Sequence, residues 1–292
     1  MKKTNQARIM IIISMAAFGT IAPFVRNIQL PSGELALYRA ILAAALIGLY
    51  LFASRQRITF SSLKRELPLL LLSGAAMGVN WILLFEAYKY TTVSAATLSY
   101  YFAPVIVTAA CPVLFHEKLT VKQVICFIMS TLGLVLLTGV SNMGKGRRDL
   151  IGIMFGLGAA VLYATVVLLN KFIKGVGGIH RTFLQFLSAI ITLIPYVSLT
   201  SGVNLSVLDG KGWTCLLIVG LIYTGVNYCL YFSSLNELPG QTAAILSYID
   251  PLVAVFISIT ILGEGITVWQ AAGGILILGF TLWNELSPRN EN

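Results

Sequence analysis

Long apolar runs separated by short polar stretches constrain the fold of this chain more than any other feature. An α-helix needs about 20 mostly apolar residues to cross the hydrocarbon core of a bilayer, or as few as about 17. At that length the sequence divides into about ten such segments. They are expected at about residues 8–25, 34–54, 67–88, 94–115, 121–140, 150–170, 181–200, 213–235, 241–262 and 267–285. The chain is therefore predicted to be an all-α membrane protein.

The charge content excludes other classes of protein. Only 11% of the 292 residues are charged, whereas soluble proteins carry about 25%. So few charges do not cover a soluble surface of this size, and the lipid bilayer is the expected surrounding. The net charge of +9 does not indicate nucleic-acid binding, because the basic residues lie in short loops between apolar segments.

No residue pattern indicates a metal, a cofactor or a catalytic centre. The four cysteines fall inside apolar segments without a Cys-x-x-Cys pair, and both histidines lie at loop edges. The sequence has no Gly-Lys-Ser/Thr motif for binding nucleotide phosphates. It also lacks the paired acids or mid-membrane histidine of an intramembrane protease. We therefore expect no metal site, no cofactor and no enzyme activity.

The two halves of the chain repeat each other. A shift of 147 residues superposes identical or similar residues in corresponding predicted helices, and a shift of 145 superposes Phe18-Gly19 on Tyr163-Ala164. The pairs at 147 are Val79-Asn80-Trp81 with Val226-Asn227-Tyr228, Tyr101 with Tyr248, Pro104 with Pro251, and Glu117 with Glu264. The predicted units are residues 1–143 and 144–292. Because each unit has an odd number of helices, the second unit is expected to insert into the membrane in the opposite orientation to the first. Such inverted repeats are typical of transporters with a central substrate site.

Loop charges predict the orientation. Most of the 20 Lys and Arg residues fall on the side of the N-terminus, which favours both termini in the cytoplasm and a multi-pass protein of the inner membrane. A basic cluster formed by Lys145, Arg147 and Arg148 runs against this bias without a physical explanation.

The segment Thr120-x-x-Gln123 is typical of a capping box that begins a helix.

Asp250 is the strongest single candidate for function. It lies near the centre of a predicted helix, where an acid costs about 2.5–3.5 kcal/mol on insertion scales. Such a group usually faces a cavity and binds a proton, a cation or a substrate amine; the alternative is a structural acid bonded to a hydroxyl. Burial favours a protonated carboxyl group, which suits proton coupling. Pro251 follows it, and Pro104 and Pro251 are expected to kink their helices at a cavity or as fixed bends.

Paired polar and aromatic residues extend this candidate substrate site. Asn80 and Asn227 occupy matching positions and precede Trp81 and Tyr228. Intramembrane amides either join helices or face a ligand, and both readings remain open. Tyr101 and Tyr248 each lie three residues before a repeated proline, so they are the tyrosines that best fit a cavity wall, with packing as the alternative.

Arg39 and Glu86 are expected near the outer ends of their helices. They would pair with each other, form a gate at the outer mouth, or attract a zwitterion. Charged residues near helix ends also extend to the interface without any function. Arg39 and Asp250 together suit a zwitterion, whereas a lone central acid equally suits an organic cation.

Several short motifs resemble the EamA family of the drug/metabolite transporter superfamily. They are Ala87–Ala96, Pro104 and His116–Thr120 in the first half, and Leu238–Ala244, Pro251 and Leu262–Thr267 in the second. The resemblance covers nearly the whole chain as two EamA units. It implies ten helices in two inverted five-helix repeats, with the first four of each repeat around a central cavity and the fifth at the periphery.

A secondary transporter that moves a small metabolite by alternating access is the expected function, most simply an exporter of an amino acid. Proton coupling through Asp250 is an option that the sequence leaves open. The alternatives are an exporter of cationic drugs and a carrier of nucleotide sugars or phosphorylated metabolites. A membrane sensor that binds a ligand without moving it is a further alternative from another class. The sequence leaves the oligomeric state open.

Overall fold

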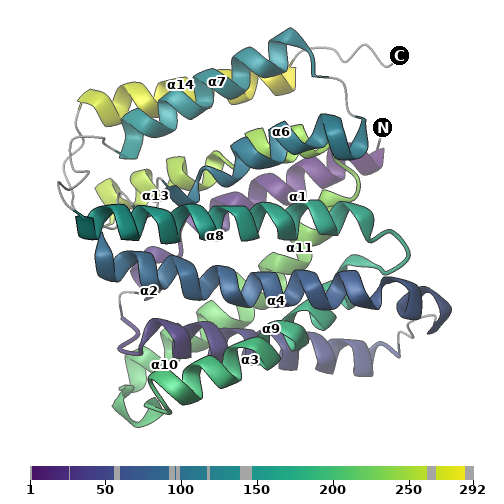
Figure 1. Cartoon of the computed structure of the whole chain (residues 1–292), viewed down its shortest axis with the longest axis vertical. Coiled ribbons are helices and arrows are strands. Elements are labelled where there is room, and N and C mark those ends of the chain that lie inside the picture. Colours follow the sequence, from purple (N-terminus) through teal and green to yellow (C-terminus); the bar gives the residue numbers. More distant parts are fainter. Residues whose placement is uncertain are drawn as a thin grey trace.

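The computed structural model describes residues 2–25, 27–55, 60–91, 96, 99–116, 119–138, 147–261 and 268–286. Every regular element in these ranges is a helix (Figure 1). Glu117, Glu264 and Lys145 lie outside the described residues, as do the side chains of Arg147 and Arg148.

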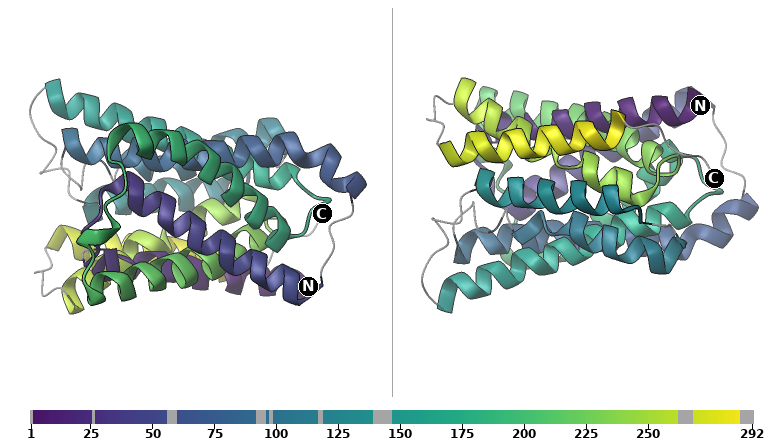
Figure 2. Two further views of the ribbon diagram at one scale, coloured as in Figure 1. Left: turned by 90° about the horizontal axis from the view of Figure 1, so that it is seen from below. Right: turned by 90° about the horizontal axis from the view of Figure 1, so that it is seen from above.

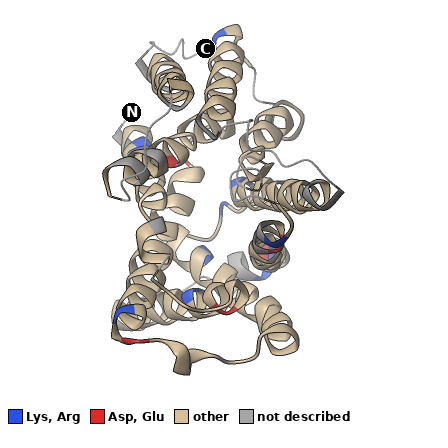
Figure 3. Cartoon of the chain, turned by 90° about the vertical axis from the view of Figure 1, so that its left-hand side faces the viewer, with Lys and Arg blue, Asp and Glu red and all other residues tan. Residues whose placement is uncertain are grey.

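Six helical spans are long and apolar enough to cross a membrane, which supports the expected all-helical membrane class. They are Lys3–Val25, Ser32–Ala53, Lys64–Leu84, Leu150–Phe172, Gly178–Thr200 and Gly210–Leu235. Shorter apolar helices cover Ala103–Phe115, Val121–Leu136 and Ala271–Phe280. Charged residues are sparse on the ribbon, which agrees with helices that face lipid or one another (Figure 3).

The helices are named in chain order. The first half contains α1 (Lys2–Gly19), α2 (Ala22–Val25), α3 (Ser32–Ala53), α4 (Phe60–Tyr90), α6 (Ala103–Phe115) and α7 (Val121–Thr138). The second half contains α8 (Arg147–Phe172), α9 (Gly178–Thr200), η2 (Leu205–Val207), α10 (Gly210–Leu217), η3 (Ile218–Val226), α11 (Asn227–Leu235), α12 (Gly240–Leu246), α13 (Ile249–Thr260) and α14 (Val268–Leu286). The predicted capping box is confirmed at the start of α7, where the Thr120 N–H donates to Gln123 Oε1 (3.0 Å) and the Gln123 N–H donates to Thr120 Oγ1 (3.2 Å).

The two halves interlock instead of folding side by side. Helix α1 packs on α11 and α13, α3 on α9 and η3, α4 on α8 and α9, and α6 on α8 and α12. Helices α7 and α14 pack on each other as an outer pair, away from most of the other helices (Figures 1 and 2). Most of the other helices share a core of mostly aliphatic and aromatic side chains from both halves, whereas Leu134 of α7 and Ile277 of α14 belong to a separate small cluster with Tyr248.

Helix α14 ends on the side of the molecule where α1 begins (Figures 1 and 2). We call this side the termini end and the opposite side the far end. Helix α8 runs from the far end to the termini end (Figure 1), so higher residue numbers in α8 lie closer to the termini end.

Two of the predicted segments are broken near their middles. Residues 241–262 form α12 and α13, which are separated by a turn at Ser247 and Tyr248; in the first half, a turn at residues 101–102 precedes α6. Pro104 and Pro251 therefore lie in the first turns of α6 and α13 rather than at kinks inside continuous helices. The first turn is where proline fits best, because its missing N–H would have no helical partner there.

The predicted segment 213–235 also departs from a regular α-helix. It consists of α10, the π-helix η3 and α11 in direct succession. A π-helix is rare and is found most often at functional sites. This wide stretch lies directly against α3.

Candidate functional site

A cavity of about 330 Å³ lies between helices of both halves. The lining residues come from α1, α3, α4, α6, α8, α11 and α13, from the segment between α1 and α2, and from the residues just before α6 and α13. They are Met15, Phe18, Gly19, Ile21, Arg39, Trp81, Leu84, Tyr100, Tyr101, Ala103, Pro104, Tyr163, Tyr228, Ser247, Asp250 and Ala254. Because both halves supply walls, a movement of one half against the other reshapes this cavity.

Arg39 is the one basic residue among the described lining residues. Its side chain is 9% exposed, and its guanidinium carbon lies 4.8 Å from the centre of the Trp81 ring. Its Nε donates a hydrogen bond to Thr224 Oγ1 (3.1 Å), and the Tyr228 hydroxyl lies nearby. Within the described part of the chain, no carboxylate lies within ion-pair distance of Arg39.

Asp250 is the one acidic residue in the same lining. It lies in the first turn of α13, where the positive end of the helix dipole favours a carboxylate. The Tyr101 hydroxyl hydrogen-bonds this carboxyl group. Helix α1 approaches closely at Gly19, where a Cβ atom would lie 2.6 Å from the Asp250 carbonyl oxygen. A larger residue at Gly19 would push α1 away from the start of α13.

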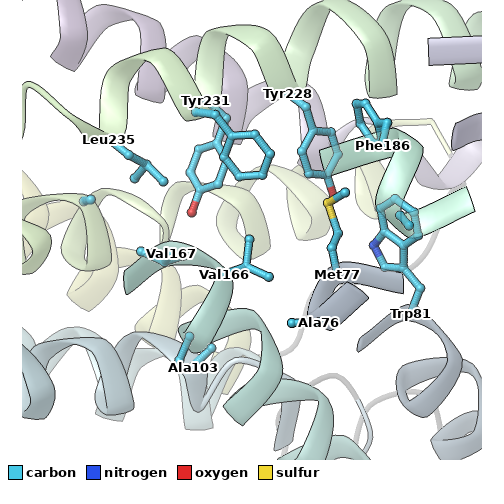
Figure 4. Packing of buried hydrophobic residues seen from close by; sticks show 14 of the residues in the cluster. Ala76, Met77, Trp81, Ala103, Val166, Val167, Phe186, Tyr228, Tyr231 and Leu235 are labelled. Atoms are coloured by element: carbon cyan, nitrogen blue, oxygen red, sulfur yellow. The ribbon is translucent and has the colours of Figure 1, made fainter. Parts of the chain in front are cut away.

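Aromatic rings form much of the remaining wall. Tyr228 lies edge-on to Phe18 (ring centres 5.1 Å apart) and to Trp81 (6.2 Å). Phe186 lies behind these rings and contacts both Trp81 and Tyr228 (Figure 4). Such edge-to-face contacts fix ring orientations, so the aromatic wall is largely preformed.

The cavity narrows toward the termini end. Tyr163 donates a hydrogen bond from its hydroxyl to the Tyr231 hydroxyl (2.8 Å). Beyond Tyr163 lies a much smaller void of about 10 Å³, lined among others by Val107, Val167 and Tyr231. Val167 lies one turn after Tyr163 in α8, closer to the termini end. The space that holds Arg39 and Asp250 therefore becomes much narrower in that direction.

The structure brings together six of the residues expected from the sequence. Trp81, Tyr101, Tyr228 and Asp250 line the cavity with Arg39, and Pro104 lines it beside Tyr101. The sequence predicts Arg39 at the outer mouth, whereas the structure places it in the wall of the same cavity as Asp250.

Tyr248 and Glu86 lie elsewhere. Tyr248 is fully buried, and its hydroxyl is 2.7 Å from Thr131 Oγ1 of α7. Glu86 accepts hydrogen bonds from Tyr196 (2.7 Å) and Lys89 (2.5 Å). It lines a separate hollow of about 270 Å³ with Lys89 and Tyr196, and Arg39 is not part of that lining.

Asn80 and Asn227 face neighbouring helices instead of the cavity. The Asn80 amide donates to the Ala159 carbonyl of α8 (2.6 Å), and the Asn227 amide donates to the Ser14 carbonyl of α1 (3.1 Å). The two amides are related by the 147-residue shift and their acceptors by the 145-residue shift. The same hydrogen bond is thus made twice, each time between one half and the other.

This arrangement predicts equivalent effects for the two amides. Asn80→Leu and Asn227→Leu should each lower the free energy of unfolding by about 0.6 kcal/mol and at most about 1.7 kcal/mol, the average and the maximum measured for hydrogen bonds between membrane helices. Each acceptor carbonyl keeps its own helical bond, so folding should survive. Thermal unfolding in detergent measures the loss, and the half-saturation concentration for transport should change less than about twofold. A loss of substrate affinity at unchanged stability would contradict the helix-joining role.

Several residues of the site were not predicted from the sequence, among them Phe18 in the lining and Thr224 beside Arg39. Phe18 was noted only as the repeat partner of Tyr163, and that pairing was the signal that could have placed both in the cavity wall. Thr224, which accepts the hydrogen bond from Arg39, had no usable signal, because its position depends on the π-helix.

Comparisons with known proteins agree with this architecture. Residues 6–139 and again 150–284 match the EamA-like transporter family. The chain is 33% identical over 278 residues to "Uncharacterized transporter YxxF" of Bacillus subtilis (strain 168), covering 94% of this chain and 88% of the relative. It is 23% identical to "Protein RarD" of Streptomyces exfoliatus, covering 98% of this chain and 92% of that protein.

A protein of known crystal structure has the same fold. It superposes with a TM-score of 0.84 at 16% identity, covering 96% of this chain and 98% of the other. The family matches span both halves of the sequence, and the apolar helices suit a bilayer. The chain therefore belongs to the EamA-like transporter family and is a membrane transporter.

Proposed function

We propose that this protein is a secondary transporter for an amino acid or a closely related zwitterion. The observation that carries the proposal is that Arg39 and Asp250 are the charged residues of one cavity lining. Neither residue has a described oppositely charged partner within ion-pair distance.

The chemistry of these two groups favours a ligand with both charges. A guanidinium group binds a carboxylate through paired, charge-assisted hydrogen bonds. A carboxylate binds an ammonium group, and each charge is costly in an apolar enclosure without a counterion. An α-amino acid supplies both counterions, whereas an organic cation would leave Arg39 unpaired. A volume of about 330 Å³ is at the small end of ligand pockets, which suits a small metabolite.

Alternating access is the proposed mechanism. Ten membrane crossings in two inverted five-helix halves would surround the cavity, and rocking of the halves would open it to each side in turn. With both termini in the cytoplasm of an inner-membrane protein, the closure at Tyr163 and Tyr231 would seal the cytoplasmic side in this state. An exporter would then release its substrate from this state. Once the substrate has left, a proton would neutralise Asp250 and so couple transport to the proton gradient.

Chemical labelling tests this state. In a protein whose four cysteines (Cys111, Cys126, Cys215 and Cys229) are replaced by alanine, we introduce Leu84→Cys in the cavity wall or Val107→Cys in the constriction. A membrane-impermeant maleimide added from the far side should label the first position and leave the second unlabelled, because Val107 is 2% exposed. Equal labelling of both positions would contradict a cavity closed toward the termini end.

Counterflow in proteoliposomes tests the function itself. Vesicles are loaded with a mixture of unlabelled amino acids, and the protein-dependent uptake of each labelled amino acid is followed without an imposed gradient. Uptake of one or a few amino acids supports the proposal. Uptake of labelled organic cations, nucleotide sugars or phosphorylated metabolites in place of amino acids would replace it, and saturable binding without exchange would indicate a sensor.

A further inference from the structure

Thr224 makes an unusual hydrogen bond within its own helix. It lies in the π-helix η3, and its hydroxyl donates to the carbonyl of Val219, five residues earlier (2.8 Å). Other threonines on the described helices donate to the carbonyl four residues earlier. These are Thr131, Thr165, Thr182, Thr192, Thr200, Thr214 and Thr260. The π-helix thus gives Thr224 a direction that a regular α-helix would not.

This direction determines what the Thr224 oxygen can bind. A hydroxyl has a single proton, and here that proton is used by the Val219 carbonyl. The oxygen is left as an acceptor, and it receives the Nε–H of Arg39 at 3.1 Å. Thr224 is completely buried, so water does not compete for this bond.

Close packing between η3 and α3 brings the two side chains together. A Cβ atom at Gly220 would lie 2.6 Å from Leu42 Cδ1, and one at Gly225 would lie 3.0 Å from Leu46 Cδ2. Both glycines lie in η3, and both leucines follow Arg39 in α3. Only residues without a side chain allow this approach, which places the backbone of η3 beside the stem of Arg39.

Two contacts together fix the plane of the guanidinium group. The Nε edge is held by Thr224 (3.1 Å), and the face lies over the Trp81 ring (4.8 Å). A planar guanidinium held at one edge and one face has little rotational freedom left. Arg39 lines the cavity, where the Tyr228 hydroxyl is a further hydrogen-bond partner of its guanidinium group.

We infer that Thr224 is a positioning residue that orients Arg39 for the carboxylate of the substrate. This inference rests on the proposed function and names a residue outside the cavity lining on which carboxylate recognition depends. Because a paired Arg–carboxylate contact requires a defined fork geometry, a guanidinium that is free to rotate would bind the same carboxylate more weakly. Thr224 would thereby affect the binding of the substrate carboxylate at Arg39 and leave the binding of the ammonium group at Asp250 unchanged.

The test compares Thr224→Val with Thr224→Ser. Valine keeps the shape of threonine and removes the acceptor, whereas serine keeps the hydroxyl. In counterflow with a labelled amino acid that the wild type carries, Thr224→Val should raise the half-saturation concentration about 5- to 30-fold. Thr224→Ser should stay within about twofold of the wild type. Competition by the corresponding amino-acid amide, which lacks the carboxylate, should be the same for all three proteins.

Two results would overturn the inference while the proposed function stands. In the first, Thr224→Val carries the amino acid with wild-type affinity. In the second, Thr224→Ser loses as much affinity as Thr224→Val, which would indicate a packing role at this position. Failure of the wild type to exchange any amino acid is a different outcome, because it removes the proposed function on which the inference rests.

Discussion

Asp250→Asn is expected to lower the affinity for the amino-acid substrate about 30-fold or more. Asparagine has nearly the shape of aspartate, so packing against α1 at Gly19 is kept and only the negative charge is removed. Removing one member of a buried charge pair costs about 2–5 kcal/mol, because the other charge is left without a counterion. In the account above, that other charge is the ammonium group of the substrate. Concentration-dependent counterflow measures the change.

The Asp250 variant also separates two roles of this residue. If Asp250 carries the coupling proton, Asp250→Asn should exchange substrate with little response to an imposed pH gradient, whereas the wild type should accelerate. The matched control is Asp209→Asn. Asp209 accepts a hydrogen bond from the Gly212 N–H at the start of α10, outside the cavity lining, and asparagine caps a helix equally well. Wild-type exchange and pH response in Asp250→Asn would remove Asp250 from both roles.

Arg39→Gln is expected to abolish high-affinity exchange of amino acids, also by about 30-fold or more. Glutamine keeps a polar side chain that can reach Thr224, but it loses the charge, the paired N–H groups and the contact over Trp81. A substrate carboxylate would then enter an apolar wall without a counterion. Competition by the corresponding amine, which lacks the carboxylate, should be unaffected by the substitution.

The two variants are expected to differ in which ligands they bind more weakly, and this difference distinguishes the two roles better than either loss of affinity alone. Asp250→Asn should weaken the amine and the amino acid together, whereas Arg39→Gln should weaken only the amino acid. Lys211→Gln is the control for the loss of a positive charge, because Lys211 is exposed near the start of α10. If Arg39→Gln leaves amino-acid affinity unchanged, Arg39 serves only to hold α3 against η3.

The sequence was sufficient for the class of fold. Apolar segment length predicted membrane helices, and the repeat predicted that Asn80 and Asn227 occupy matching positions. The first feature depends on local composition and the second on the alignment of one half of the sequence with the other, and both are available without a structure. The sequence left open whether these amides join helices or face a ligand, and the matched hydrogen bonds are a finding of the structure. The predicted cavity position of Asp250 is consistent with its place in the lining, because an acid in an apolar helix has few other stable surroundings.

The details of the site depended on geometry that the sequence does not encode locally. Tyr101 and Tyr248 are equivalent in the alignment, yet one lines the cavity and the other bonds Thr131 in α7. The helix breaks before Pro104 and Pro251 and the π-helix around Thr224 set the directions of these side chains. The sequence predicts Arg39 at the outer mouth because Arg39 lies near one end of its predicted helix. The depth to which the cavity extends beside α3 is known only from the structure.

Competition in counterflow tests the central claim most directly. Uptake of a labelled amino acid that the wild type carries is measured with increasing amounts of the same amino acid, its amine lacking the carboxylate, and its acid lacking the amino group. We predict strong competition by the amino acid and at least about tenfold weaker competition by each single-charge analogue, because Arg39 and Asp250 each need a counterion. Equal competition by the amine and the amino acid would contradict the claim and show that the cavity recognises a cation alone.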